Sequence, residues 1–220
     1  MADIANDHDP AVRVLPRPGD SPAPGAGPTT AASGAGPVAT THGDQGAATA
    51  ARYLLAGIRI ALGWIFLWAF LDKVFGLGYS TPSERSWLNG GSPTQGFLGN
   101  AAKGPFTDLY HSIAGNPVAD VLFMTGLLAI GGALMLGIAM RLAAVATAVM
   151  MALMWAAEWP LARHTSAGEP SGSNNPIVDY HVIYALAAAA VASIAGAGDR
   201  WGLGRQWRAL PVIRDHRWLQ

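Results

Sequence analysis

The sequence predicts an all-α integral membrane protein, a four-helix bundle with a disordered N-terminal tail and a long loop between the first two helices. Hydrophobic residues make up 51% of the 220 residues and charged residues only 13%, against about 25% charged in ordinary soluble domains. The charged residues lie mostly outside four apolar stretches. Each stretch approaches the roughly 20 residues that a helix needs to cross a hydrocarbon core.

The N-terminal segment, residues 1–51, is dominated by Ala, Gly, Pro, Thr, Ser and Asp, as in Ser21-Pro22-Ala23-Pro24-Gly25. Such a composition cannot bury enough apolar surface to offset the entropy lost on ordering, so we predict a disordered tail. Its acidic start and its lack of an apolar core argue against a signal peptide.

The transmembrane domain is predicted to be residues 52–198, with helices at about 53–73, 118–138, 142–159 and 177–196. Asn175 is suited to cap the fourth helix and Pro176 to occupy its first position. Residues 199–220 form a basic, tryptophan-containing segment after it.

Small residues recur at every fourth position of the spans: Ala129, Ala133 and Gly137; Ala144, Ala148, Ala152 and Ala156; Ala185, Ala189 and Ser193. This spacing lets helix backbones approach closely in lipid and predicts a compact bundle. The same pattern is equally typical of a homo-oligomer face.

The orientation follows from the cations that flank the spans. Nine lie on the side of the termini (Arg13, Arg17, Arg52, Arg141, Arg200, Arg205, Arg208, Arg214 and Arg217), and four lie on the other side (Lys73, Arg85, Lys103 and Arg163). We therefore predict that both termini are cytoplasmic. The 74–117 connection would then lie outside, as a lid with a short interfacial helix at Phe106–Ala114.

Six ionisable residues are predicted to gather at the outer end of the bundle: Asp72, Lys73, Asp120, Glu158, Asp179 and His181. Ionisable groups at membrane depth are costly and usually functional, although charges are also ordinary where helix ends meet lipid headgroups. Glu158, His181 and Asp120 are the candidates for proton transfer, because partly buried carboxylates and imidazoles titrate near neutrality.

Helical spacing assigns these residues to faces. Arg59, Gly63, Phe66, Phe70 and Lys73 share one face of the first helix, and Met151, Met154, Trp155 and Glu158 share one face of the third. Tyr180, His181 and Tyr184 cluster on the fourth helix, whereas Asp179 points nearly the opposite way. Such a lining suits a flat apolar ring such as a quinone, with Lys73, Arg59, Trp155 and Tyr184 as candidate binding residues. An ordinary bundle core is the alternative.

Two further points bear on the site. Arg59 lies inside a span, where it either pairs with Asp199 or extends to the headgroups. The chain has no cysteine, which excludes disulfides, thiol chemistry and cysteine-ligated clusters. No histidine pair in the spans can hold a b-type haem. We predict no metal site, although His181, Glu158 and His164 form a weak alternative set.

The chain resembles the DoxX/DoxD family of four-span bacterial membrane proteins over about residues 52–218. The resemblance is carried by Arg59 with Gly63-Trp64 and Lys73, by the loop Trp87–Leu98, by Gly126–Gly137 with Arg141, by Asn175-Pro176 with Asp179 and His181, and by Gly196–Gly204. It implies a membrane subunit of a thiosulfate:quinone oxidoreductase in the bacterial inner membrane, working with a second subunit. Nothing in the charge balance suggests nucleic acid as a partner.

Two functional interpretations remain open at this stage. In the first, the chain passes electrons from a small anion, such as thiosulfate, to quinone, with the outer cations gathering the anion. In the second, it is a non-catalytic anchor that assembles redox or stress-response partners. A small-solute transporter is a more distant third. No residue carries single electrons, so the first interpretation requires two-electron chemistry, a bound cofactor or a partner.

Overall fold

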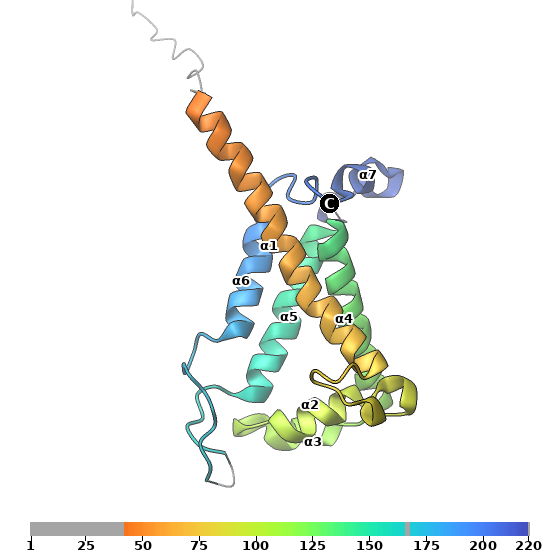
Figure 1. Ribbon diagram of the computed structural model, residues 1–220, viewed down its shortest axis with the longest axis vertical. Helices are drawn as coiled ribbons and strands as arrows, with labels where there is room; N and C mark the ends of the chain where they lie inside the picture. The colour runs from red at the N-terminus through yellow and green to blue at the C-terminus, as the bar shows by residue number, and fades with distance from the viewer. Residues whose placement is uncertain (1–41, 166–167, 220) are drawn as a thin grey trace, which may run out of the picture. The chain divides into compact units, whose positions relative to one another are not determined.

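Four apolar helices form an up-and-down bundle: α1 (His42–Phe75), α4 (Pro117–Leu136), α5 (Met140–Glu158) and α6 (Tyr180–Ser193) (Figure 1). The computed structural model describes residues 42–165 and 168–219, all of which belong to one compact unit. In the order α1, α4, α5, α6, each helix packs against the next, and α6 returns to α1. The described residues contain an isolated bridge between His164 and Pro170 but no strand. The prediction of an all-α membrane bundle is therefore confirmed.

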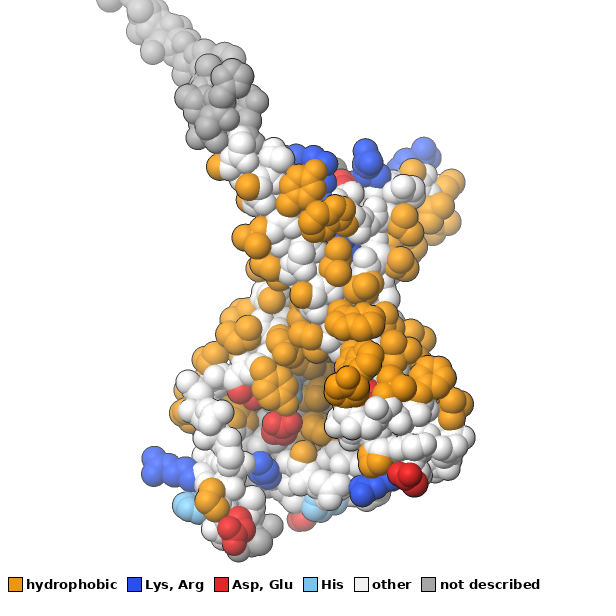
Figure 2. Space-filling model, in the orientation of Figure 1, with side chains coloured by type: hydrophobic (Ala, Val, Ile, Leu, Met, Phe, Trp, Pro, Cys, Tyr) orange, Lys and Arg blue, Asp and Glu red, His pale blue; other side chains and the backbone are white. Residues whose placement is uncertain are grey.

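The bundle has two different ends, the loop end and the C-terminal end. At the loop end lie the last residue of α1, the first of α4, the last of α5 and the first of α6. At the C-terminal end lie the last residue of α4, the first of α5 and residues 194–219. Exposed apolar side chains cover the surface between these ends, whereas charged side chains gather at the ends themselves (Figure 2). This is the distribution of a protein that contacts lipid around its middle.

In the part of the chain that the structure describes, three helical segments are long and apolar enough to cross a membrane: Gly46–Phe75, Pro117–Leu136 and Met140–Glu158. The apolar helix α6 has 14 residues and therefore rises only about 21 Å, less than the roughly 30 Å of a hydrocarbon core. The fourth predicted helix exists, but it is shorter than the predicted 177–196.

The start of α6 explains this difference. Asp179, not Asn175, is the N-cap, and its side chain accepts hydrogen bonds from the amides of His181 and Val182. The Asn175 side chain instead accepts from the amides of Ile177 and Val178, both at 2.9 Å. Asn175 thus closes a separate turn, so the prediction that it caps the helix was wrong.

The first helix also differs from its prediction. Its first ten residues, 42–51, were predicted to belong to the disordered tail, but they form the beginning of α1. This stretch contains Ala47, Ala48, Ala50 and Ala51, and alanine has the highest helix propensity. The rest of the predicted tail, residues 1–41, lies outside the described residues.

Helices α1 and α4 approach each other closely at two glycines. A Cβ atom added at Gly131 would stand 2.6 Å from the backbone nitrogen of Leu67, and one added at Gly63 would stand 2.8 Å from that of Met135. The core beside this contact is built from Leu62, Phe66, Met124, Leu127, Ile130, Leu134, Met151, Ala188 and Val191.

The predicted small-residue stripes form only part of the interior face. Ala129, Ala148, Ala152, Ala189 and Ser193 are exposed, Ala144 and Gly137 are buried, and Ala133, Ala156 and Ala185 are partly buried against the core. The prediction that these stripes bring the helices together therefore holds for half of their residues. Between α1 and α4 the close approach is made by glycine, which places no side chain between the two backbones.

The long connection forms a layer of short helices against the loop end: η1 (Ser83–Arg85), η2 (Trp87–Asn89), α2 (Pro93–Ala101), η3 (Gly104–Phe106) and α3 (Thr107–Ile113). The predicted interfacial helix corresponds to α3. Helix α2 was not predicted, although Ser92 and Pro93 are a recognisable start. The Ser92 hydroxyl accepts from the Gln95 amide at 3.1 Å, and Pro93 is the first helical residue.

The C-terminal end is closed by α7 (Gly204–Ala209), α8 (Pro211–Arg214) and η4 (Arg217–Leu219). The last carbonyls of α4, which have no partner within the helix, all find one here. Ile138 donates to Ala133, and Leu203 donates to Leu136 at 2.7 Å. The guanidinium of Arg59 donates to the other two, those of Leu134 and Met135.

Candidate functional site

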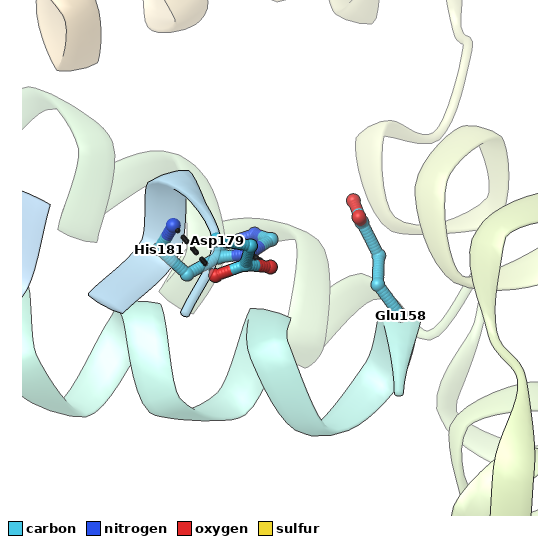
Figure 3. A group of neighbouring side chains, drawn as sticks. All are labelled: Glu158, Asp179 and His181. Carbon is cyan, nitrogen blue, oxygen red and sulfur yellow. Dashed lines mark hydrogen bonds and ion pairs between the residues drawn. The ribbon is translucent and has the colours of Figure 1, made fainter. Parts of the chain in front are cut away.

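Several polar side chains lie together at the loop end, where α5 ends and α6 begins (Figure 3). Glu158 is the last residue of α5, Asp179 caps α6, and His181 lies in the first turn of α6. One ligand atom from each of these three residues lies within 4.8 Å of the others. We call Glu158, Asp179, Tyr180 and His181 the acid–histidine cluster.

His181 is the centre of this cluster and is fully buried. Its Nδ1 lies 2.8 Å from Asp179 Oδ2. Asp179 Oδ1 accepts from the amide of His181 at 3.0 Å and from that of Val182 at 3.3 Å. Helical spacing predicted that Asp179 points away from His181. This prediction was wrong, because Asp179 is the N-cap with an extended backbone (φ −116°, ψ −168°) and the helical wheel does not apply to it.

The other ring nitrogen of His181 is the unusual atom. Nε2 is buried and has no hydrogen-bond partner among the described residues. The Asp179 carboxylate can only accept a hydrogen bond while it is ionised, so Nδ1 carries a proton. Nε2 is then a bare lone pair in the neutral ring and a donor in the imidazolium. Arg59 Nε is also buried without a partner among the described residues, but a guanidinium stays protonated, whereas an imidazole nitrogen can bind a ligand or exchange a proton.

Tyr180 links His181 to Glu158. Its ring lies 4.0 Å from the His181 ring, centroid to centroid, and its hydroxyl donates to Glu158 Oε1 at 2.8 Å. Glu158 is partly exposed, whereas His181 is buried. The cluster therefore runs from a carboxylate in contact with solvent to a buried imidazole.

Aromatic side chains lie around the cluster, as the sequence indicated. Tyr184 lies one turn further along α6, with its ring 5.8 Å from that of Tyr180. Trp155 Nε1 donates to the carbonyl of Ile177 at 3.0 Å, which fixes α5 to the segment before α6. Trp155 also contacts Trp159 at 5.6 Å between ring centroids. The predicted binding residues Trp155 and Tyr184 thus lie close to the cluster.

Asp120 and Asp72 belong to the loop end but make different contacts. Asp120 Oδ1 accepts from the Ser92 hydroxyl and from the amide and hydroxyl of Thr94, at 2.9, 2.8 and 2.6 Å. Asp72 accepts from the amides of Tyr79 and Ser80 and from the Ser80 hydroxyl. Both carboxylates hold the connection against the bundle. Asp120, predicted to be catalytic, therefore has a structural environment.

Lys73 also lies outside the cluster. It lines a cavity of about 480 Å³ with residues of the connection, among them Ser80, Arg85 and Asn100, and with neither Glu158 nor His181. Of the six ionisable residues predicted to gather at the outer end, Lys73 thus lies in a different cavity from Glu158 and His181.

Arg59 lies at the opposite end of the bundle from the cluster. Its guanidinium donates to the carbonyls of Leu134 and Met135, and also to those of Arg200 and Trp201 at 2.9 and 3.1 Å. Asp199 pairs instead with Arg208. Both predicted interpretations of Arg59 were wrong, because backbone carbonyls left over at a helix end can satisfy a buried cation as well as a carboxylate can.

The donor set of the cluster also bears on metal binding. Glu158, Asp179 and His181 have suitable ligand atoms, whereas His164, proposed from the sequence, is not in the group. The three residues are already engaged with one another, with Tyr180 and with the helix amides. A metal ion would have to replace these hydrogen bonds.

The fold and this cluster define a small membrane bundle with a buried histidine at one end. The chain belongs to the DoxD family, since the family model described as TQO small subunit DoxD matches residues 54–165. The match includes residues 54–75 of α1, all of α4 and α5, and Glu158, and it ends before Asp179 and His181. No curated protein and no solved structure matches the chain.

Proposed function

We propose that this protein is the membrane subunit of a quinone-linked oxidoreductase, of the thiosulfate:quinone type. The acid–histidine cluster would supply protons to the quinone headgroup. The observation that carries the proposal is the buried, unpartnered Nε2 of His181, oriented by a carboxylate on Nδ1. The family description adds support for a small subunit with a partner.

The chemistry follows from the two states of His181. As an imidazolium, Nε2–H donates a hydrogen bond to a quinone carbonyl, and Asp179 stabilises the positive charge. Reduction of the quinone to the quinol takes up two electrons and two protons. One proton comes from Nε2, which leaves the neutral ring. The second reaches the quinol from solvent, and Glu158 would also reprotonate His181 through one bridging water, since its carboxylate lies within 4.8 Å of a ring nitrogen of His181. The Tyr180 hydroxyl orients the Glu158 carboxylate.

The electrons come from outside the chain in this proposal. A reduced-sulfur anion, oxidised at the partner subunit, would deliver two electrons to the quinone. The cations of the loop end, Lys73, Arg85, Lys103 and Arg163, would attract the anionic donor to this side. Lys103 also donates to the carbonyl of Ser171 at 2.7 Å, so it joins the two loops that a partner would contact.

The proposal includes an orientation in the bacterial inner membrane, with the loop end outside and both termini in the cytoplasm. The chain has no cysteine, so single cysteines can be introduced at Ser33, Ser92 and Ser171. An impermeant thiol reagent applied to intact cells should label the last two positions only. Labelling at Ser33 alone would reverse the orientation.

The direct test is a titration of the purified full-length chain with a quinone analogue. We expect His181→Gln to weaken the affinity at least about tenfold, because a charge-assisted hydrogen bond is worth about 1.5–3 kcal/mol. His111 is an exposed histidine in α3, and His111→Gln is the matched control that should bind as the wild type does. Equal affinity in both variants would reject the quinone site.

The second candidate function is a non-catalytic anchor for redox or stress-response partners. It is favoured by the exposed Trp201 and Trp218 at the C-terminal end. A homo-oligomer face at the exposed Ala148 and Ala152 of α5 is a related proposal. The anchor interpretation expects partner binding that survives His181→Gln, with no donor-dependent quinone reduction by the assembled complex.

A further inference from the structure

A second cavity lies at the C-terminal end of the bundle, away from the acid–histidine cluster. Its volume is about 660 Å³, within the range of about 300–1,000 Å³ that is usual for ligand sites. Five arginines line it, Arg52, Arg141, Arg200, Arg205 and Arg208, together with a single acidic residue, Asp199. Basic side chains also gather at this end in Figure 2.

The arginines reach the cavity from three separate parts of the chain. Arg52 belongs to α1, Arg141 to the start of α5, and the other three to the segment after α6. Arginines that only orient a membrane protein need to lie in the flanks of its spans and need no common cavity. Convergence from three elements on one cavity therefore requires a further explanation.

The cavity is held in a fixed geometry by buried contacts. Arg59 donates to the carbonyls of Arg200 and Trp201 and so ties the wall of the cavity to α4. Gly198 and Gly137 approach so closely that a Cβ atom at Gly198 would stand 2.0 Å from the Gly137 carbonyl oxygen. The wall is thus built before any ligand arrives, which lowers the entropy cost of binding.

The charge of the cavity is incompletely neutralised. Arg208 donates to both carboxylate oxygens of Asp199, at 2.7 and 2.8 Å. Arg200 lies over the Tyr53 ring at 5.1 Å, where it contacts no carboxylate. Arg52 and Arg205 make no hydrogen bond or ion pair among the side chains that the structure describes. The C-terminal end of α6 contributes only about half a negative charge, so the cavity favours an anion.

We propose that this cavity binds the phosphate group of an anionic phospholipid. Guanidinium groups match phosphate oxygens in bidentate geometry, and basic pockets at the ends of membrane helices are suited to lipid headgroups. The neighbouring Ile194, Trp201 and Leu203 are exposed apolar residues, placed where acyl chains and headgroups would meet. The cavity is also much larger than inorganic phosphate requires.

The test compares lipids on the detergent-solubilised full-length chain by titration. Short-chain phosphatidylglycerol should bind in preference to short-chain phosphatidylcholine. The double variant Arg52→Gln/Arg205→Gln should weaken phosphatidylglycerol binding about 25-fold, taking roughly fivefold for each arginine near the headgroup. Arg85→Gln/Arg163→Gln removes the same charge from the loop end and should leave binding unchanged.

Three results would overturn the proposal. Equal affinity for the two lipids would show that the cavity does not select an anion. Equal weakening by the two double variants would show that binding depends on the overall charge of the protein and not on this cavity. Inorganic phosphate that binds as tightly as phosphatidylglycerol would identify a free anion in place of a lipid. Thermal unfolding of each variant checks that the fold is retained, which we expect because Arg52 and Arg205 are exposed.

Discussion

Arg59 and His181 are both fully buried polar residues in the same bundle, at opposite ends, and their surroundings differ. The two terminal nitrogens of Arg59 donate to four backbone carbonyls. His181 has one partner for its ring, Asp179, and its second ring nitrogen has none. Arg59 Nε also lacks a partner, but the charge of the guanidinium is surrounded by acceptors.

The comparison distinguishes a buried charge that is surrounded by acceptors from the buried imidazole on which the proposed function rests. The sequence made both residues candidates, Arg59 because it lies inside a span and His181 because it lies at the outer end of one, since ionisable groups in membranes are costly. What distinguishes them is the use of their hydrogen-bonding capacity. Arg59 donates to the carbonyls at the end of α4 and to those of residues 200–201. His181 Nε2 has no such partner among the described residues and is available to bind a ligand or a proton.

The largest effect is expected at Arg59. Arg59→Met keeps a long side chain but leaves buried carbonyls unpaired, at a cost of about 1–3 kcal/mol for each group. We expect a loss of several kcal/mol in stability, measured by thermal unfolding in detergent, while folded protein retains its quinone-analogue affinity. Arg52→Met, at an exposed arginine of the same helix, is the control and should change stability by less than about 0.5 kcal/mol. A variant as stable as the wild type would refute the structural role.

A smaller effect is expected at the contact between α1 and α4. Gly131→Ala places a methyl group against the backbone of Leu67, and a backbone cannot rotate away. Overpacking of this kind costs about 1–3 kcal/mol. At Gly132 an added Cβ meets nothing within 4 Å, so Gly132→Ala should be neutral or slightly stabilising because alanine favours helix. Equal unfolding temperatures for the two variants would contradict the close approach.

The smallest effect is expected at Asp120, which tests whether it belongs with Arg59 or with His181. Asp120→Asn weakens the three hydrogen bonds to Ser92 and Thr94 and should cost about 1–2 kcal/mol. Hydrogen exchange in α2 should rise, while quinone-analogue affinity stays unchanged. Asp108→Asn, at an exposed aspartate of α3, is the control for the charge change. A loss of analogue affinity in Asp120→Asn would contradict a purely structural role and would show that Asp120 contributes to quinone binding.

The sequence was sufficient for the architecture, because apolar length and the distribution of charge are read directly from it. It was less reliable where several signals competed. Asn175 and Asp179 are both plausible helix caps, and the structure selects the one nearer the apolar run. The small-residue stripes were correct for only half of their residues, because alanine is abundant on every face. The two glycines that make the contact between α1 and α4, Gly63 and Gly131, do not repeat at that spacing.

The candidate site was predicted in part. Glu158 and His181 were placed together because both lie at helix ends on the same side of the bundle. The role of Tyr180 in joining them depends on the position of its hydroxyl relative to Glu158, which helical spacing does not give. Lys73 and Arg59 share a helix face with apolar residues, and that face does turn inward. Their partners, however, come from loops: residues 200–201 for Arg59 and the connection for Lys73. Helical periodicity cannot predict where such loops lie.

The central claim is that Glu158 and His181 act as one unit on a bound quinone headgroup. The most direct measurement is quinone-analogue affinity for the wild type, Glu158→Gln, His181→Gln and the double variant. The account predicts that each single variant binds more weakly and that the double variant loses less than the sum of the two, with a coupling of about 0.5–3 kcal/mol. Strictly additive effects, or wild-type affinity in both single variants, would contradict it.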